Sequence, residues 1–99
     1  MSVEDREKLR PSAGARYAVE LASWDGARAV YRGAVHLADV SYPLEVAVGP
    51  SGLEVRVDGP DAVRAAHEKP AGALVKAAAK LPRDPDAGPP PRRVVRWRG

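Results

Sequence analysis

A chain of 99 residues has the length of one small domain. Apolar residues make up 44% and charged residues 29%, which is typical of a folded globular protein and excludes a disordered chain. Cysteine is absent, so disulfides, thiolate metal sites and cysteine nucleophiles are excluded, and a cytoplasmic location is expected. No segment is long and apolar enough to cross a bilayer, and the charged start MSVEDREKLR does not resemble a secretory signal.

The net charge of +3 is unevenly distributed along the chain. Residues 1–60 contain seven Lys and Arg against nine Asp and Glu, whereas residues 61–99 contain nine against four. A local excess of positive charge is typical of proteins that contact nucleic acid or an acidic protein surface. Any such contact is therefore expected in the second part of the chain.

The amino-terminal segment has the signals of a helix start. Ser2 followed by Asp5 resembles a capping box, and acidic side chains stabilise the first turn of a helix. We expect a short helix over residues 2–10, which Pro11 ends. No candidate site residue falls in this segment.

Residues 16–59 show the alternation of apolar and polar side chains that is typical of half-buried strands, interrupted by turn residues. This pattern predicts a four-stranded antiparallel meander with one buried face. The residues assigned to that face are Tyr17, Val19, Leu21, Tyr31, Val35, Leu37, Tyr42, Leu44, Val46, Val48, Leu53, Val55 and Val57. The opposite face is predicted to be mostly polar, with Val30 and Trp24 as its apolar members.

Turn lengths must agree with these faces, because a slip of one residue moves every side chain to the other face. A three-residue loop over residues 24–26 satisfies this condition for the first turn, with Gly26 in the left-handed conformation. Loops over residues 38–41 and 49–52 satisfy it for the second and third turns. Pro50 suits the first central position of a type I turn.

Helical signals follow the strands. Pro60 suits the first position of a helix, and Pro70 is predicted to divide the region into a short piece over 60–69 and a better helix over 71–81. A helix that follows four strands must cover their apolar face. Residues 1–82 are therefore predicted to form a single α+β domain, an antiparallel meander packed on one face by a C-terminal helix.

The end of the chain differs in composition from the domain. Residues 83–91 contain four prolines and a glycine, which predicts an extended linker. Residues 92–99 form a tail with four arginines, no acid and one of the two tryptophans. Three alternatives remain open for this tail: a fifth strand packed on the sheet, a free basic arm, or an unstructured end.

The tail contains the candidates for binding an anionic partner. Guanidinium groups bind phosphates, and an indole ring stacks on a base. The candidates are Arg92, Arg93, Arg96, Trp97 and Arg98. If the tail is a strand, Val95 and Trp97 lie on one face, and the arginines that alternate with them lie on the other.

A second candidate interaction surface combines Trp24 and Val30 with lysines of the helix. An exposed tryptophan beside a sheet edge is typical of an interface, although the tail could instead fold back and cover both residues. Lys76 and Lys80 are four residues apart, so they either extend a basic surface or form the solvated side of the helix.

Catalysis, cofactors and metal binding are not expected. His36 and His67 are the two histidines, they lack the spacing of a metal motif, and we interpret both as ordinary surface residues. No nucleophile elbow and no glycine-rich phosphate motif is present. The two histidines are the first residues to test if the protein is an enzyme.

The sequence favours a small non-enzymatic binding or adaptor module whose basic tail contacts an anionic partner such as nucleic acid, with the sheet as a platform. The alternative is a protein–protein interaction component, a homodimer formed through a sheet edge or the tail. Large apolar side chains are few, so the core is expected to be thin, and dimerisation would stabilise it.

Overall fold

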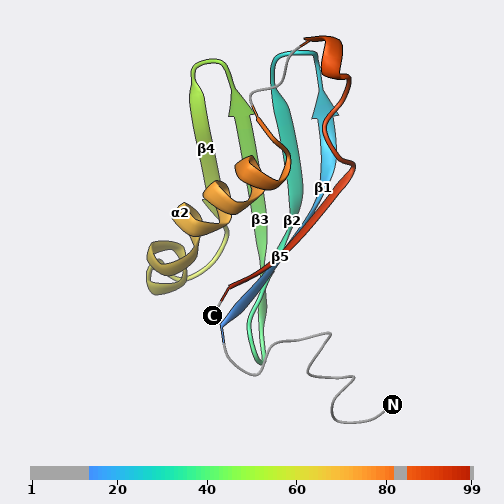
Figure 1. Cartoon of the computed structure of the whole chain (residues 1–99). Coiled ribbons are helices and arrows are strands. Elements are labelled where there is room, and N and C mark those ends of the chain that lie inside the picture. Colours follow the sequence, from blue (N-terminus) through green and yellow to red (C-terminus); the bar gives the residue numbers. More distant parts are fainter. Residues whose placement is uncertain (1–13, 82–84, 99) are drawn as a thin grey trace, which may run out of the picture.

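The computed structural model describes residues 14–81 and 85–98, and Figure 1 shows their arrangement as a sheet with one helix across it. The helix expected over residues 2–10 lies outside the described residues. The main elements are β1 (Ala15–Trp24), β2 (Ala29–His36), β3 (Ser41–Gly49), β4 (Gly52–Val57), α2 (Asp61–Ala78) and β5 (Arg93–Arg98).

All neighbouring strands of the sheet are antiparallel, in the order β4-β3-β2-β1-β5. The first four strands form the predicted meander. The tail forms β5, which pairs with β1 at the edge opposite β4. Of the three alternatives for the tail, the structure therefore shows the packed strand. The predicted α+β fold, with its fifth strand from the tail, is confirmed.

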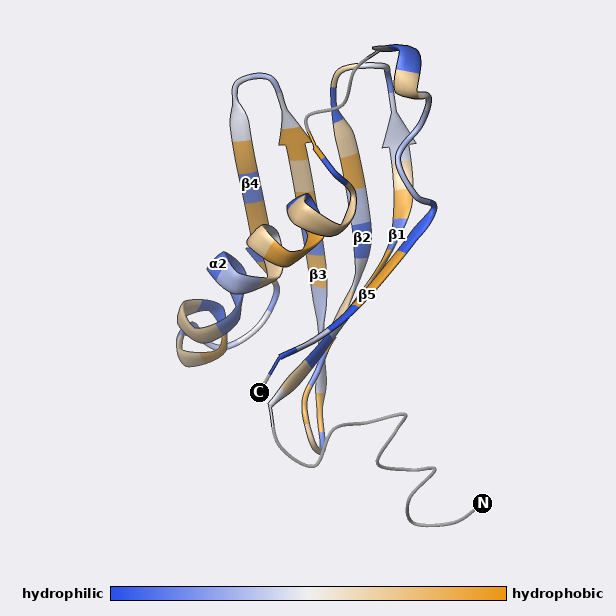
Figure 2. Ribbon diagram, viewed as in Figure 1, coloured by the Kyte–Doolittle hydropathy of each residue, from blue (hydrophilic) through white to orange (hydrophobic). Residues whose placement is uncertain are grey.

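One face of the sheet is buried against α2. Residues that lie opposite each other in neighbouring strands share a face, as Val19 does with Val94 and Tyr31 with Val46. The larger buried side chains of this core are Tyr17, Val19, Tyr31, Val35, Leu44, Val46, Val48, Val57, Val75 and Val94. Figure 2 shows the alternation of apolar and polar residues along β3 and β4. The predicted buried face is therefore confirmed, except that Leu53, which was assigned to it, is 38% exposed at the edge of the sheet.

Two of the three turns can be compared directly with the predicted register. The turn between β3 and β4 has the predicted register, with Val48 opposite Leu53. The turn between β2 and β3 is displaced, since Tyr42 lies opposite Val35 and not opposite Leu37. A displacement by two residues keeps every side chain on its predicted face, so alternation alone could not detect it.

The first turn differs from the prediction because β1 contains a bulge between Leu21 and Ser23. A bulge inserts one residue and reverses the alternation beyond it. Trp24 consequently lies opposite the buried Ala29 and packs against the core. The prediction that Trp24 belongs to the outer face is wrong for this reason.

The loop that joins β1 to β2 covers residues 25–28 and is held by one side chain. Asp25 Oδ1 accepts hydrogen bonds from the backbone N–H groups of Arg28 (2.6 Å) and Ala27 (2.9 Å). These bonds lower the pKa of Asp25 below its ordinary value. Gly26 has the predicted left-handed conformation, with φ of +93°, in a loop one residue longer than predicted.

A single helix, α2, replaces the two predicted pieces, and Pro70 lies inside it. Proline removes one backbone donor from the helix. The helix continues because Ala71 and Val75, in the turn after the proline, are fully buried against the sheet, and such packing supplies most helix stability. Val63 packs against the core, whereas Ala66 is exposed.

The close approach of α2 to β4 depends on a glycine. A β-carbon on Gly72 would overlap with Cγ2 of Val55 and would lie 3.1 Å from Cδ2 of Leu53. The helix also contacts β3 and β5. It therefore reaches both edge strands of the sheet from one face.

The helix ends in a Schellman motif. The Lys80 N–H donates to the Ala77 carbonyl (3.2 Å), and the Leu81 N–H donates to the Lys76 carbonyl (3.1 Å). Lys80 has a left-handed φ of +54°, and Leu81 is buried. Lys80 therefore does not continue the helical spacing from Lys76 that the sequence suggested.

The proline-rich segment predicted as a linker is attached to the sheet at its end. It contains a short 3₁₀ turn, Pro85–Ala87. The Tyr31 hydroxyl donates a hydrogen bond to the Pro91 carbonyl (2.6 Å), and the Leu21 N–H donates to the Arg92 carbonyl (2.7 Å). These two bonds fix the chain immediately before β5.

Replacing Lys80 with Gly should stabilise the fold. A left-handed φ costs a lysine about 1 kcal/mol that glycine does not lose, so the free energy of unfolding should rise by about that amount. Urea denaturation measures the change. Lys76→Gly is the matched control, because Lys76 is helical and exposed, and it should lower stability by about 1 kcal/mol. A loss of stability in both variants would contradict the assigned helix end.

Candidate functional site

β5 distributes the tail candidates over both faces of the sheet edge. Trp97 lies opposite Arg16 on the outer face, which is the face away from α2. Val94 is buried in the core, and Arg96 and Arg98, which share its parity, lie on the helix side, where both are exposed. The predicted separation of Trp97 from these two arginines is confirmed.

Trp97 is a fixed aromatic surface at this edge. Its side chain is 50% exposed, and the Arg16 guanidinium carbon lies 5.7 Å from the ring centroid. A cation placed over an aromatic ring is attracted to it and restrains its orientation. Arg16 Nε is buried and has no hydrogen-bond partner within the described ranges, so the ring is the contact that orients this guanidinium.

The arginines of the tail differ in their acidic neighbours. In the part of the chain that the structure describes, no acid forms an ion pair with Arg92, Arg96 or Arg98. Arg93 lies opposite Glu20 on the outer face. The helix side of the edge and the residue before β5 therefore concentrate positive charge without an acidic partner.

Arg98 also lies close to a contact between β1 and α2. The Tyr17 hydroxyl is 2.9 Å from His67 Nδ1, and the two rings meet edge to face, with centroids 5.9 Å apart. Burial raises the pKa of Tyr17 and outweighs the opposing effect of the nearby Arg98. Burial and the charge of Arg98 together lower the pKa of His67. The neutral imidazole that results can accept a hydrogen bond from the Tyr17 hydroxyl at Nδ1. His67 is therefore a half-buried partner of Tyr17 and differs from the predicted surface residue.

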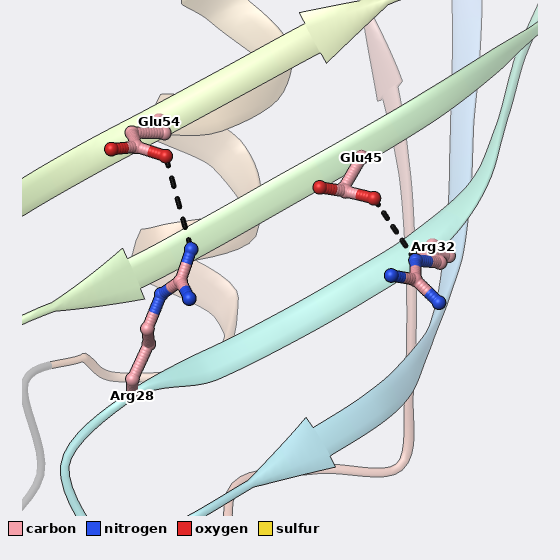
Figure 3. Close-up of polar contacts among 4 residues, drawn as sticks. All are labelled: Arg28, Arg32, Glu45 and Glu54. Atoms are coloured by element: carbon pink, nitrogen blue, oxygen red, sulfur yellow. Dashed lines mark hydrogen bonds and ion pairs between the residues drawn. The ribbon is translucent and has the colours of Figure 1, made fainter.

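The outer face has a row of alternating charges across all five strands. We call it the charge row, and from β5 to β4 its members are Arg93, Glu20, Arg32, Glu45 and Arg56. Within it, Arg32 Nε is 2.9 Å from Glu45 Oε2. Nearby on the same face, Arg28 Nη2 is 3.8 Å from Glu54 Oε2 (Figure 3). Because bases and acids alternate, this predicted polar face has little net charge.

His36 lies on the outer face, as predicted, and its Nδ1 is 2.7 Å from the Ser41 hydroxyl. Across the described residues, no group of three or more His, Cys, Asp or Glu is arranged to hold a metal ion. Within the same ranges, no helix has the length and apolar character needed to cross a membrane.

The second predicted surface is not assembled as expected. Trp24 packs on the core face, whereas Val30 is half-buried on the outer face. Val95 lies opposite β1 at a different register position, so the tail does not cover Val30. Lys76 and Lys80 are exposed at the end of α2, and Lys80 is beyond the helix.

Comparison with known proteins does not assign a function to these surfaces. No family model, no curated protein and no solved structure matches the chain. Register, exposure and charge are therefore the grounds for assigning a function, and the β5 edge combines all three.

The neutral state of His67 predicts a pH dependence of stability. Burial and the charge of Arg98 lower the pKa of His67 in the folded protein, so the unfolded chain binds a proton at higher pH than the folded protein does. The free energy of unfolding should therefore fall as the pH decreases from about 8 through about 6.5, the ordinary pKa of histidine. It should level off once the folded protein is also protonated.

Urea denaturation midpoints across this pH range measure the effect. His67→Gln should remove the dependence, because glutamine does not titrate, whereas His36→Gln should keep it. An unmodified protein whose midpoint does not change over the range would show that His67 is not held neutral.

Proposed function

We propose that the protein is a small, non-enzymatic, cytoplasmic binding module whose basic β5 edge contacts single-stranded nucleic acid. The supporting observation is the presence, on one exposed edge strand, of Trp97 together with arginines that have no acidic partner in the described ranges. Exposed aromatic rings beside cationic side chains are the combination that binds single strands, because rings stack on bases and cations neutralise phosphates.

The alternation along β5 favours a single strand over a duplex. Trp97 projects to the outer face, and Arg96 and Arg98 project to the helix side. A flexible strand that follows the edge can turn a base toward Trp97 and its phosphates toward Arg96 and Arg98. The bases of a duplex are stacked inside it, so a duplex would use the arginines and leave the ring without a partner.

Our proposal gives the outer face of the sheet a smaller part than the platform role that the sequence suggested. In the charge row, Glu20 and Glu45 lie between arginines, so the two acids offset most of the attraction that the three arginines would offer a polyanion. The binding surface that we propose is consequently the β5 edge and the arginine before it.

The homodimer hypothesis is a separate proposal, and a different edge supports it. β4 is the last strand on its side of the sheet, and an unpaired edge strand can add a strand from another chain.

Replacing Arg96 and Arg98 together with Ala should weaken binding to a labelled single-stranded oligonucleotide and reduce its salt dependence. Each phosphate contact contributes about 0.7 to the slope of log K against log salt, so the double variant should lose about 1.4. Fluorescence anisotropy titrations at several salt concentrations measure both quantities. The Lys69→Ala, Lys76→Ala double variant removes the same charge from α2 and should keep the slope. Equal losses in the two variants, or no binding by the unmodified protein, would contradict the proposal.

Replacing Trp97 with Ala should reduce the affinity by about 1–3 kcal/mol, the usual contribution of one stacked base. Trp97→Phe keeps a ring and should lose less. In the unmodified protein, stacking should quench tryptophan fluorescence, and Trp97→Ala should abolish the quenching because the remaining Trp24 packs against the core. Quenching that persists in Trp97→Ala would show that the ligand binds elsewhere.

A further inference from the structure

β4 is one of the two edge strands of the sheet, on the side opposite β5 (Figure 1). The Val57 N–H donates to Glu68 Oε2 (2.8 Å) instead of to β3, whereas the Asp58 N–H donates to the Pro43 carbonyl of β3 (2.9 Å). Because backbone groups alternate in direction along an antiparallel strand, Leu53 and Val55 also direct their N–H and C=O groups away from β3. The outward groups of Leu53 and Val55 have no backbone partner among the described residues.

The same edge has an exposed apolar side chain at one end and a hollow at the other. Leu53 is 38% exposed and is one of three large apolar side chains exposed in the described ranges. A surface hollow of about 540 Å³ lies along β4 from Glu54 and continues past the opposite end to Gly59. A second strand that pairs with β4 in the antiparallel direction would bring its own start next to this hollow.

The charges of β4 specify one register for pairing with a second copy. Glu54 and Arg56 are exposed on the outer face, on either side of Val55. When two β4 strands lie antiparallel with Val55 opposite Val55, Glu54 of each copy lies opposite Arg56 of the other. Opposite charges in directly facing positions stabilise a strand pair, and like charges destabilise it.

The neighbouring registers are less favourable for the same reason. A shift by two residues in one direction places Glu54 opposite Glu54, and a shift in the other direction places Arg56 opposite Arg56. A shift by one residue would set the core face of one copy beside the outer face of the other. Among these registers, the one centred on Val55 is therefore the one in which the charges are complementary.

We propose that two copies of this chain form a symmetric dimer by antiparallel pairing of β4, with Val55 at the twofold axis. The two Val55 residues exchange N–H to C=O bonds across the axis. The Val57 N–H stays bound to Glu68. The two sheets become continuous, Glu54 of each copy extends the charge row of the other, and the exposed Leu53 is placed beside the buried Val57.

This inference does not depend on the nucleic-acid function, because β4 and β5 are opposite edges of the sheet. The two proposals are measured by different experiments, one by oligonucleotide titration and the other by the mass of the protein in solution. Failure of one therefore leaves the other standing.

Two charge-reversal variants test the register. Glu54→Arg alone and Arg56→Glu alone each place like charges opposite one another in the symmetric dimer, so each should raise the dissociation constant at least about tenfold. An equimolar mixture of the two variants restores both pairs of opposite charges, and the mixed dimer should form. Sedimentation velocity from about 10 µM to about 1 mM suits an interface of this small size.

Arg93→Glu is the matched control, since it reverses a charge of the same face at the other edge and should leave the dimer intact. Circular dichroism verifies that every variant is folded. A cross-link gives an independent measurement, because the chain has no cysteine: Glu54→Cys mixed with Arg56→Cys and oxidised glutathione should form a disulfide-linked pair.

Three results would overturn the proposal. The unmodified protein could be monomeric over the whole concentration range, or the folded variants could remain monomeric when mixed. The dimer could also dissociate on Arg93→Glu and persist in both β4 variants, which would place the interface at another surface.

Discussion

The antiparallel pairing of β5 with β1 is the interaction on which the arrangement of charge and edges depends. The Tyr31 hydroxyl and the Leu21 N–H hold the chain just before β5, so the arginine-rich segment enters the sheet and does not extend from it as an arm. This pairing covers the edge of β1 that β2 leaves open, buries Val94 and makes β5 and β4 the two edge strands of the sheet. The β5 edge consequently presents cations and an indole ring, and the β4 edge presents the exposed Leu53 with the charges of Glu54 and Arg56.

The charge row explains why the surface chemistry lies at the edges instead of on the broad outer face. Glu20 and Glu45 each lie between two arginines of neighbouring strands, so attraction is satisfied within the sheet. The arginines on the helix side of β5 lack such neighbours in the described ranges, because the facing positions of β1 hold the core residues Ala15 and Tyr17. The arginines of the charge row and those on the helix side of β5 therefore differ in the residues that the strand register places opposite them.

Alternation allowed the buried face of the strands to be predicted, because burial of one face forces a period of two on residues such as Val46 and Val48. The register was less accessible, since a displacement of two residues leaves the alternation intact, and for this reason the charge row was missed. Trp24 was assigned to the wrong face because a bulge has no clear sequence signal. Pro70 was predicted to divide the helix, but burial of the following turn outweighs the loss of one backbone hydrogen-bond donor. The opposite faces of Trp97 and Arg96 followed from parity, whereas the contact of Tyr17 with His67 joins distant elements and required the packed structure.

The pairing partner of β5 has a further consequence for how the molecule is made. Among the described strands, β1 and β5 are the first and last in chain order, with β2, β3, β4 and α2 between them. On the ribosome, the nascent meander can form early, but β1 stays without its neighbour until residues 93–98 have been synthesised and have emerged. During that interval both margins of the sheet are open to other nascent chains, and non-local pairing of this kind is slow. Completion of the sheet is thus a late event in biosynthesis, and the interval before it is when aggregation competes most strongly with folding.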